Sequence, residues 1–202
     1  MDKIKASQFA ELSYICRYVP PPYQRVEYLQ ANTTNASSSS LRILPDVAYF
    51  ADFEITLMRT DNQPTKFAGT TSGHCLQRSG NDGKFAFYGS NIYNSSASIL
   101  TKTTCKWKDG KIYINGTQVS TQVKPADTGI QFALFGIGDG AGYTNIRIYD
   151  CKLWDLDGNL VRDMYPCRRA ADSVLGFYDM VTETFFPPVG TVGSFIAGSD
   201  VN

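Results

Sequence analysis

The last third of the chain decides the fold, because it is a succession of short apolar segments separated by turn residues. The segments are IRIY (146–149), LVRD (160–163), YPCRR (165–169), GFYD (176–179) and GTVGSF (190–195). Short runs of β-prone residues bounded by Asp-Gly, Pro and Gly predict β-strands joined by tight turns. This third of the chain is therefore predicted to be a set of antiparallel strands.

The same pattern extends upstream, almost to residue 23. Phe53, Ile55 and Leu57 alternate with polar residues, which is typical of a strand with one face toward solvent. In the run KIYINGTQV (111–119), an Asn-Gly pair separates two β-prone halves and predicts a type I′ hairpin turn. Many short strands without an interior helix predict an all-β fold, a two-sheet antiparallel sandwich over residues 23–202.

Two details of the strand pattern predict specific geometry. Apolar residues occupy even positions up to Ile148 and odd positions from Tyr149 on. In a regular strand these two sets face opposite sides, so we predict either a β-bulge near Tyr149-Asp150 or a strand covered on both faces. Arg162 and Asp163 are adjacent, so their side chains should point to opposite faces and meet different partners.

The C-terminal motifs resemble those of concanavalin A-like (LamG-like) jelly-roll domains, found in bacteriophage virion proteins and in surface proteins of gut bacteria. The likeness covers roughly residues 25–198 and includes the WKDGKIYING run that starts at residue 107. It departs from the family pattern at Asp172-Ser173, at Met164-Tyr165-Pro166 and at Phe185-Phe186. The resemblance implies that the two-sheet sandwich is a jelly roll that binds or decorates surfaces, in most members without catalytic apparatus.

The residues that carry this resemblance suit structural roles. Gly176 suits a tight turn, Phe177 and Phe195 suit the core, and Pro166 suits the end of a strand. The motifs therefore predict the architecture better than they predict a ligand site.

Composition and charge exclude some classes of binding partner. Nineteen basic residues balance nineteen acidic ones, so the chain lacks the positive surface that binds nucleic acid or an anionic membrane. No apolar run approaches the length of a membrane span, and the first residues lack the apolar core of a signal peptide. We expect no nucleic-acid partner, no membrane insertion and synthesis in a cytosol.

Cysteine spacing and acidic loops predict no cofactor. The five cysteines lie far apart without a C-x-x-C pair, which favours reduced, mostly buried thiols over a zinc site. The run from Asp155 to Asn159 (DLDGN) has the oxygen-rich composition of a Ca²⁺ loop but lacks the glutamate that closes an EF-hand. Asp-Gly explains it as a hairpin turn without metal. A Ca²⁺ ion bound elsewhere in the sandwich is an alternative, for which the sequence indicates no ligands.

The first 22 residues differ from the rest and are predicted to form an anchoring arm. Their apolar residues recur at near-helical spacing: Ile4, Phe9, Leu12 and Ile15. Three prolines (20–22) then forbid a helix and predict an extended, stiff connector. A short apolar arm cannot bury itself alone. It either packs on its own sandwich or anchors the domain to other virion proteins or to sister copies.

The glycine-rich segment from Gly136 to Gly142 is the candidate ligand site. It is not a phosphate loop, because no Lys-Ser/Thr follows and no helix begins. Acid and amide groups bind sugar hydroxyls, and an aromatic ring packs on the C–H face of a pyranose. Four residues offer these groups: Asp139, Tyr143, Asn145 and, as a stacking ring, Trp107. A plain long turn accounts for the same glycines.

A glycoside hydrolase is the enzymatic alternative, because hydrolases share this sandwich. Such an enzyme needs two carboxylates across a cleft. On a strand, the acids of such an enzyme follow a pattern close to E-x-D-x-E, all on one face. Asp52 and Glu54 fit two positions of this pattern, but Thr56 occupies the third. The single histidine, His74, has no recognisable triad or metal partners. We predict no catalytic residues and no enzyme.

The resemblance implies a biological setting. It points to a non-catalytic virion protein (a head fibre, a capsid decoration or a tail-associated protein) that is made in the host cytoplasm and displays a face for a cell-surface or mucosal glycan. The alternatives are a carbohydrate-binding lectin of the bacterial cell surface and a glycoside hydrolase.

Overall fold

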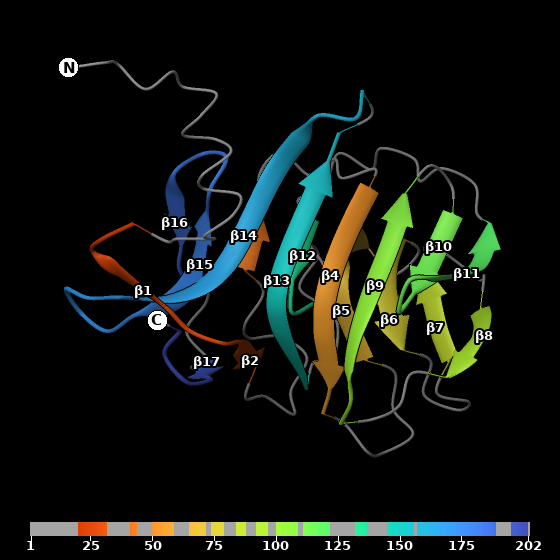
Figure 1. Cartoon of the computed structure of the whole chain (residues 1–202), viewed down its shortest axis with the longest axis horizontal. Helices are drawn as coiled ribbons and strands as arrows, with labels where there is room; N and C mark the ends of the chain where they lie inside the picture. Colours follow the sequence, from red (N-terminus) through yellow and green to blue (C-terminus); the bar gives the residue numbers. More distant parts are fainter. Residues whose placement is uncertain are drawn as a thin grey trace.

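The computed structural model is an antiparallel β-sandwich in which a large sheet lies in front of a smaller one (Figure 1). It describes residues 20–31, 41–43, 50–58, 65–71, 74–78, 84–87, 92–96, 100–108, 111–121, 132–136, 145–155, 157–188 and 195–201. Within these ranges there is no helix, and hence none that is long and apolar enough to cross a membrane. The predicted all-β sandwich is confirmed.

The large sheet has 11 strands. Eight of them follow one another across it: β11 (Thr117–Thr121), β10 (Lys111–Ile114), β9 (Lys102–Lys108), β4 (Phe50–Leu57), β13 (Ile146–Trp154), β14 (Leu160–Arg169), β15 (Leu175–Asp179) and β16 (Thr184–Phe186). The other three are β1 (Tyr23–Arg25), β2 (Leu29–Ala31) and β17 (Phe195–Ala197). β1 pairs with β14, and β2 pairs with both β13 and β17. The C-terminal segments therefore supply the centre and one end of this sheet.

The smaller sheet has 6 strands, in the order β3 (Leu41–Ile43), β12 (Phe132–Leu134), β5 (Thr65–Thr71), β6 (His74–Arg78), β7 (Lys84–Phe87) and β8 (Ile92–Ser96). In Figure 1 it lies behind the strands β13, β4 and β9. The large sheet thus has one face toward the smaller sheet and one face that the smaller sheet leaves uncovered.

The hydrophobic core lies between the two sheets. Phe53, Ile55 and Leu57 of β4 are at most 1% exposed, as their alternation predicts. Ala68 of β5 and Leu134 of β12 belong to the same buried cluster, so the smaller sheet covers this face. Burying one side chain of the size of leucine stabilises the fold by about 1.5–3 kcal/mol, which makes this shared interior the main source of stability.

The β-bulge predicted near Tyr149 is present. β13 pairs with β4 in one register up to Ile148 and in a shifted register from Asp150 on, so Tyr149 is the extra residue. Because of this shift, Ile148 before the bulge and Cys151 after it both lie in the core, although their positions differ in parity.

Arg162 and Asp163 meet different partners, as predicted. Arg162 Nε lies 3.6 Å from Oδ2 of Asp179, and both side chains are almost completely buried. Asp163 Oδ2 accepts a hydrogen bond from Lys152 Nζ at 3.3 Å. The adjacent charges of β14 therefore enter two separate ion pairs.

Asp179 is the centre of the buried polar contacts at this end of the sheet. Its Oδ1 accepts hydrogen bonds from the backbone N–H of Asp163 at 2.8 Å and of Val181 at 3.1 Å. Its Oδ2 accepts one from Thr182 Oγ1 at 2.7 Å and faces Arg162. Asp179 is 0% exposed, so these contacts replace the water that its charge has lost.

The prediction that Pro166 ends a strand is wrong, because Pro166 lies inside β14. Its carbonyl accepts a hydrogen bond from the backbone N–H of Val26 at 3.0 Å. The missing N–H of Pro166 points to the same side, where the neighbour of β14 changes from β13 to β1. No hydrogen bond to β15 is lost there, which is why proline is tolerated in mid-strand.

Gly176 lies in β15 and not in the predicted tight turn, and close packing explains the glycine. A Cβ on Gly176 would lie 2.7 Å from Cζ of Phe185 and even closer to the backbone oxygen of Phe186. Phe185 thereby joins an aromatic cluster, with its ring centroid 5.2 Å from that of Tyr23, which in turn lies 4.9 Å from Tyr178.

Two turns test the remaining predictions. Asn115 and Gly116 have φ angles of 49° and 77°, so the type I′ hairpin is confirmed. The predicted extended proline connector is wrong. Residues 21 and 22 form a turn, in which Tyr23 N–H donates to the carbonyl of Pro20 at 3.1 Å.

Candidate functional site

The outer face of the large sheet, opposite the core, carries ion pairs between neighbouring strands. Lys106 Nζ lies 2.9 Å from Oδ2 of Asp52, and Lys102 Nζ lies 2.9 Å from Oε2 of Glu54. A glycosidase places its two carboxylates on opposite sides of a cleft. Here the two acids are neighbours on β4, and each faces its own lysine on β9, so the geometry fits a solvated strand face.

Tyr149, the bulge residue, contacts several polar and aromatic side chains at one end of this outer face. Its hydroxyl and Thr56 Oγ1 are 3.0 Å apart and hydrogen-bonded. Lys102 Nζ lies 4.2 Å from the centroid of the Tyr149 ring. The Tyr28 ring meets the Tyr149 ring at 5.5 Å with an interplanar angle of 66°, which is an edge-to-face contact.

Arg147 continues this group on the same strand. Its Cζ lies 4.3 Å from the centroid of the Tyr28 ring. Its Nε donates a hydrogen bond to Gln30 Oε1 at 2.9 Å, and Gln30 Nε2 donates to Asn145 Oδ1 at 3.2 Å. These contacts connect one continuous set of side chains, which we call the outer-face patch: Tyr28, Gln30, Lys102, Asn145, Arg147 and Tyr149.

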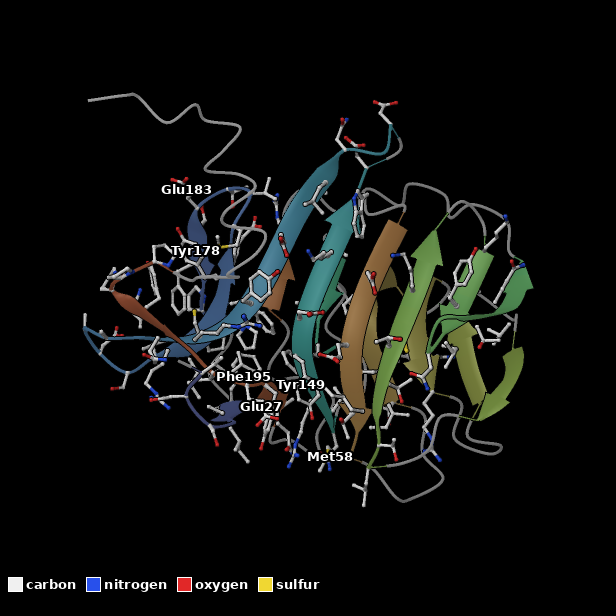
Figure 2. The ribbon with its side chains drawn as sticks, in the orientation of Figure 1. Glu27, Met58, Tyr149, Tyr178, Glu183 and Phe195 are labelled. Carbon is white, nitrogen blue, oxygen red and sulfur yellow. The ribbon has the colours of Figure 1, made fainter. Side chains whose placement is uncertain are left out.

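The patch occupies one end of the sheet. Figure 2 shows Tyr149, Glu27 and Met58 toward the lower end of the large sheet, whereas Tyr178 and Glu183 lie at the upper left of the view. The backbone N–H of Met58, just after β4, donates to the carbonyl of Asn145 at 2.9 Å. The end of β4 and the start of β13 are therefore joined directly beneath the patch.

A glycine fixes the position of Tyr28. A Cβ on Gly198 would lie 2.8 Å from Cδ1 and Cε1 of Tyr28, so the ring packs directly against the backbone at this position. With Gly198 against it, Arg147 over it and Tyr149 at its edge, the Tyr28 ring is held by three neighbours. It serves as a rigid support for the arginine and not as a free stacking surface.

Leu100 is an exposed apolar residue in a strained conformation near the patch. Its side chain is 61% exposed and its φ angle is 64°. Its backbone N–H donates to the carbonyl of Leu57 at 2.9 Å, and Lys102 follows two residues later. The left-handed conformation costs a leucine about 1–2 kcal/mol. Such strain at an exposed apolar residue is a pointer to function.

The structure places the predicted ligand residues unevenly. Asn145 belongs to the patch. Trp107 lies in β9 opposite Ala51, at the other end of β4 from Leu57, so its backbone is roughly 20 Å from Asn145 at the usual rise of a strand. The side chain of Trp107 lies outside the described part of the structure. So do Asp139 and Tyr143, and so do the predicted anchoring residues Ile4, Phe9, Leu12 and Ile15.

Sequence reasoning missed most of the patch. Asn145, Arg147 and Tyr149 alternate along one strand, so their shared face was readable from the sequence. The contribution of Gln30 was not, because it depends on the pairing of β2 with β13, and Gln30 and Arg147 are 117 positions apart.

The run from Asp155 to Asn159 is a turn. Asp155 Oδ1 accepts from the backbone N–H of Asp157 at 3.0 Å and of Asn159 at 2.8 Å, while Oδ2 accepts from Asn159 Nδ2 at 3.0 Å. The side-chain hydrogen bond from Asn159 is the largest influence that holds the pKa of Asp155 below its ordinary value. Both oxygens are thus engaged inside the turn, and no metal-binding group of three His, Cys, Asp or Glu occurs among the described residues.

Three cysteines have described side chains, and all are free thiols. Cys105, Cys151 and Cys167 are buried, as predicted for reduced structural cysteines. Burial raises the pKa of Cys105 and of Cys151, and it raises the pKa of Cys167 to about 12. The thiolate is the reactive form, so these residues fill the interior and do not act as nucleophiles.

Comparisons with known proteins add to the fold and not to the site. No family model and no curated protein sequence matches the chain. A solved structure from Bacteroides ovatus, of a candidate carbohydrate-binding protein, is similar with a TM-score of 0.57 and 10% sequence identity over 89% of this chain. The chain spans 62% of the length of that protein. A likeness at this identity shows a shared β-sandwich fold.

Proposed function

We propose that this protein is a non-catalytic carbohydrate-binding β-sandwich of the concanavalin A-like type, and that it binds sugar at the outer-face patch. The observation that carries the proposal is the connected set Asn145–Gln30–Arg147–Tyr28, fixed on the sheet face opposite the smaller sheet. The resemblance of the C-terminal motifs supports it. So does the similar fold of the Bacteroides ovatus protein, which its description names as a carbohydrate binder.

The chemistry of the patch suits a sugar. Amide and guanidinium groups bind pairs of hydroxyls on a pyranose ring, and the patch offers both in fixed positions. Leu100, at the same end of the sheet, supplies an apolar surface for C–H groups. Tyr149 is only 7% exposed, so it forms the floor of the patch and does not stack on the ligand.

Affinity electrophoresis on a panel of polysaccharides tests the proposal. We expect wild-type protein to be retarded by at least one of them. Asn145→Ala and Gln30→Ala should bind about tenfold more weakly, because each loses a polar contact of about 1 kcal/mol or more. Gln118→Ala is the matched control, since Gln118 is an exposed amide on the distant β10–β11 hairpin. Wild-type affinity of the two patch variants, or no retardation by any polysaccharide, would overturn the proposal.

The absence of catalysis is tested separately. We expect no release of reducing sugar when the protein is incubated with the same polysaccharides, because the two acids of β4 lie side by side in lysine ion pairs. Release that disappears in Glu54→Gln would replace this proposal with a glycoside hydrolase.

We place the protein in a virion, as a head fibre, a capsid decoration or a tail-associated protein, on the strength of the resemblance alone. The alternative is the surface of a bacterial cell. Deleting residues 1–19 should leave the sandwich folded and abolish attachment to the particle. Unchanged attachment, or copurification of the wild-type protein with a bacterial envelope in place of a particle, would contradict the virion setting and the anchoring role of the arm.

A further inference from the structure

Arg147 differs from the other cation of the outer-face patch. Lys102 faces Glu54 at 2.9 Å, so its charge is balanced. Arg147 contacts only the Tyr28 ring and the neutral amide of Gln30 among the described residues. Among the residues that the structure describes, the patch therefore carries an excess positive charge at Arg147.

Within the described part of the chain, two other arginines of the same sheet, unlike Arg147, pair with carboxylates. Arg168 Nη1 lies 2.9 Å from Asp200 Oδ1, and Arg169 forms two hydrogen bonds to the carboxylate of Asp172. These two guanidinium groups each face a carboxylate of the chain itself.

The guanidinium of Arg147 is held in place without its terminal nitrogens. Its Cζ lies over the Tyr28 ring, and Gln30 accepts the hydrogen bond from Nε. Asn145 in turn holds Gln30, so the orientation is fixed from two directions. Neither Nη atom donates to a described residue. In a planar fork these donors match the two oxygens of one oxyanion.

We propose that Arg147 binds the acidic group of a charged sugar, a uronic acid carboxylate or a sugar sulfate. This inference rests on the proposed carbohydrate-binding function and names its ligand class. The half-buried side chain is preorganised, so little rotamer entropy is lost when the oxyanion binds. The neighbouring amides of Asn145 and Gln30 then lie within the span of the same sugar residue.

Binding of the full-length protein to matched polysaccharides tests this inference. Polygalacturonate supplies carboxylates, dextran sulfate supplies sulfates, and dextran supplies the neutral control. We expect at least one acidic polymer to bind about ten times more tightly than dextran. Arg147→Gln should remove this preference, with a loss of about tenfold to a hundredfold. Arg147→Lys should recover only part of it, because lysine keeps the charge but lacks the fork.

The controls separate a specific site from general charge. Arg168→Gln removes one positive charge from β14, outside the patch, and should bind as the wild type does. Equal losses of affinity in Arg168→Gln and Arg147→Gln, or full affinity in Arg147→Lys, would contradict bidentate binding of the oxyanion by Arg147. A thermal melt of each variant shows whether it is folded, and Arg147→Lys carries the test if Arg147→Gln is not.

The two proposals fail in different ways. If neutral and acidic polymers bind equally and the Arg147 variants bind as the wild type does, the acidic ligand is wrong and the sugar-binding function stands. If no polymer binds, both are wrong.

Discussion

Arg162 and Arg147 lie on neighbouring strands of one sheet, and their surroundings are opposite. Arg162 is 7% exposed and faces the fully buried carboxylate of Asp179. Arg147 is half-buried on the outer face and is held by a tyrosine ring and an amide, both neutral. One arginine has its charge satisfied within the fold, and the other has only its position fixed by the fold.

This difference separates a structural region from a binding region. A buried ion pair is costly to break, because the remaining charge stays in the interior without a partner. A cation held by neutral groups on an open face costs the fold little to keep, and its charge is available to a ligand. Variants at the Asp179 end should therefore change stability, and variants at the patch should change binding.

Asp179→Ala should have the largest effect on the fold. It leaves Arg162 without its carboxylate and removes the acceptor of Thr182 Oγ1. We expect a loss of about 3–5 kcal/mol in the free energy of unfolding, measured by urea denaturation. Asp200→Ala, which breaks the half-exposed pair with Arg168, should cost less than about 1 kcal/mol. Equal losses in the two variants would remove the structural half of the comparison.

Gly176→Ala should come next. The added methyl group meets the Phe185 ring and the backbone oxygen of Phe186, and overpacking of this kind costs about 1–3 kcal/mol. Adding Phe185→Leu relieves only the ring contact, because the backbone oxygen of Phe186 stays where it is. A double variant as stable as the wild type would show that the ring alone determines the glycine.

The structural region was largely predictable from the sequence. The period-2 pattern of Phe53, Ile55 and Leu57 gave the buried face, and the slip in parity gave the bulge at Tyr149. These features are local, and a chain of alternating side chains determines them within a few residues. Pro166 was misplaced because its tolerance depends on the exchange of neighbours from β13 to β1, which no local pattern shows.

The binding region was much less predictable. Asn145 was predicted as a ligand residue beside the glycine-rich segment, and the structure places it in the patch. Tyr28 and Gln30 come from the other end of the chain, and only the pairing of β2 with β13 brings them to Arg147. Non-local strand pairing therefore determines the candidate site, whereas local alternation determines most of the fold.

Leu100→Gly tests whether the strained conformation of Leu100, near the patch, serves ligand binding. Glycine adopts a φ angle of 64° freely, so the free energy of unfolding should stay the same or rise by up to about 1 kcal/mol after the entropy of the glycine is counted. Binding to the same polysaccharides should fall several-fold, because the exposed apolar side chain is lost. Ser173 has a φ angle of 61° in a distant turn. Ser173→Gly should therefore change the free energy of unfolding as Leu100→Gly does and leave binding unchanged. Unchanged binding in Leu100→Gly would place Leu100 outside the site.

Asp155→Asn should have the smallest effect, and it gives the comparison a pH dependence. Asp155 and Asp179 each accept a backbone N–H two residues ahead, but Asp155 is in an exposed turn and has no arginine. Its pKa lies below the ordinary aspartate value of 3.8, chiefly because of the Asn159 side chain. The unfolded chain then binds more protons than the folded one, so the stabilisation is complete above pH 3.8 and is lost as the pH falls through the lower folded pKa. Urea denaturation between about pH 2 and pH 6 brackets this transition. The free energies of unfolding of the wild type and of Asp155→Asn should converge at the acid end of the range. A constant difference across the range would mean that the hydrogen bonds of the turn, and not the charge of Asp155, carry its contribution.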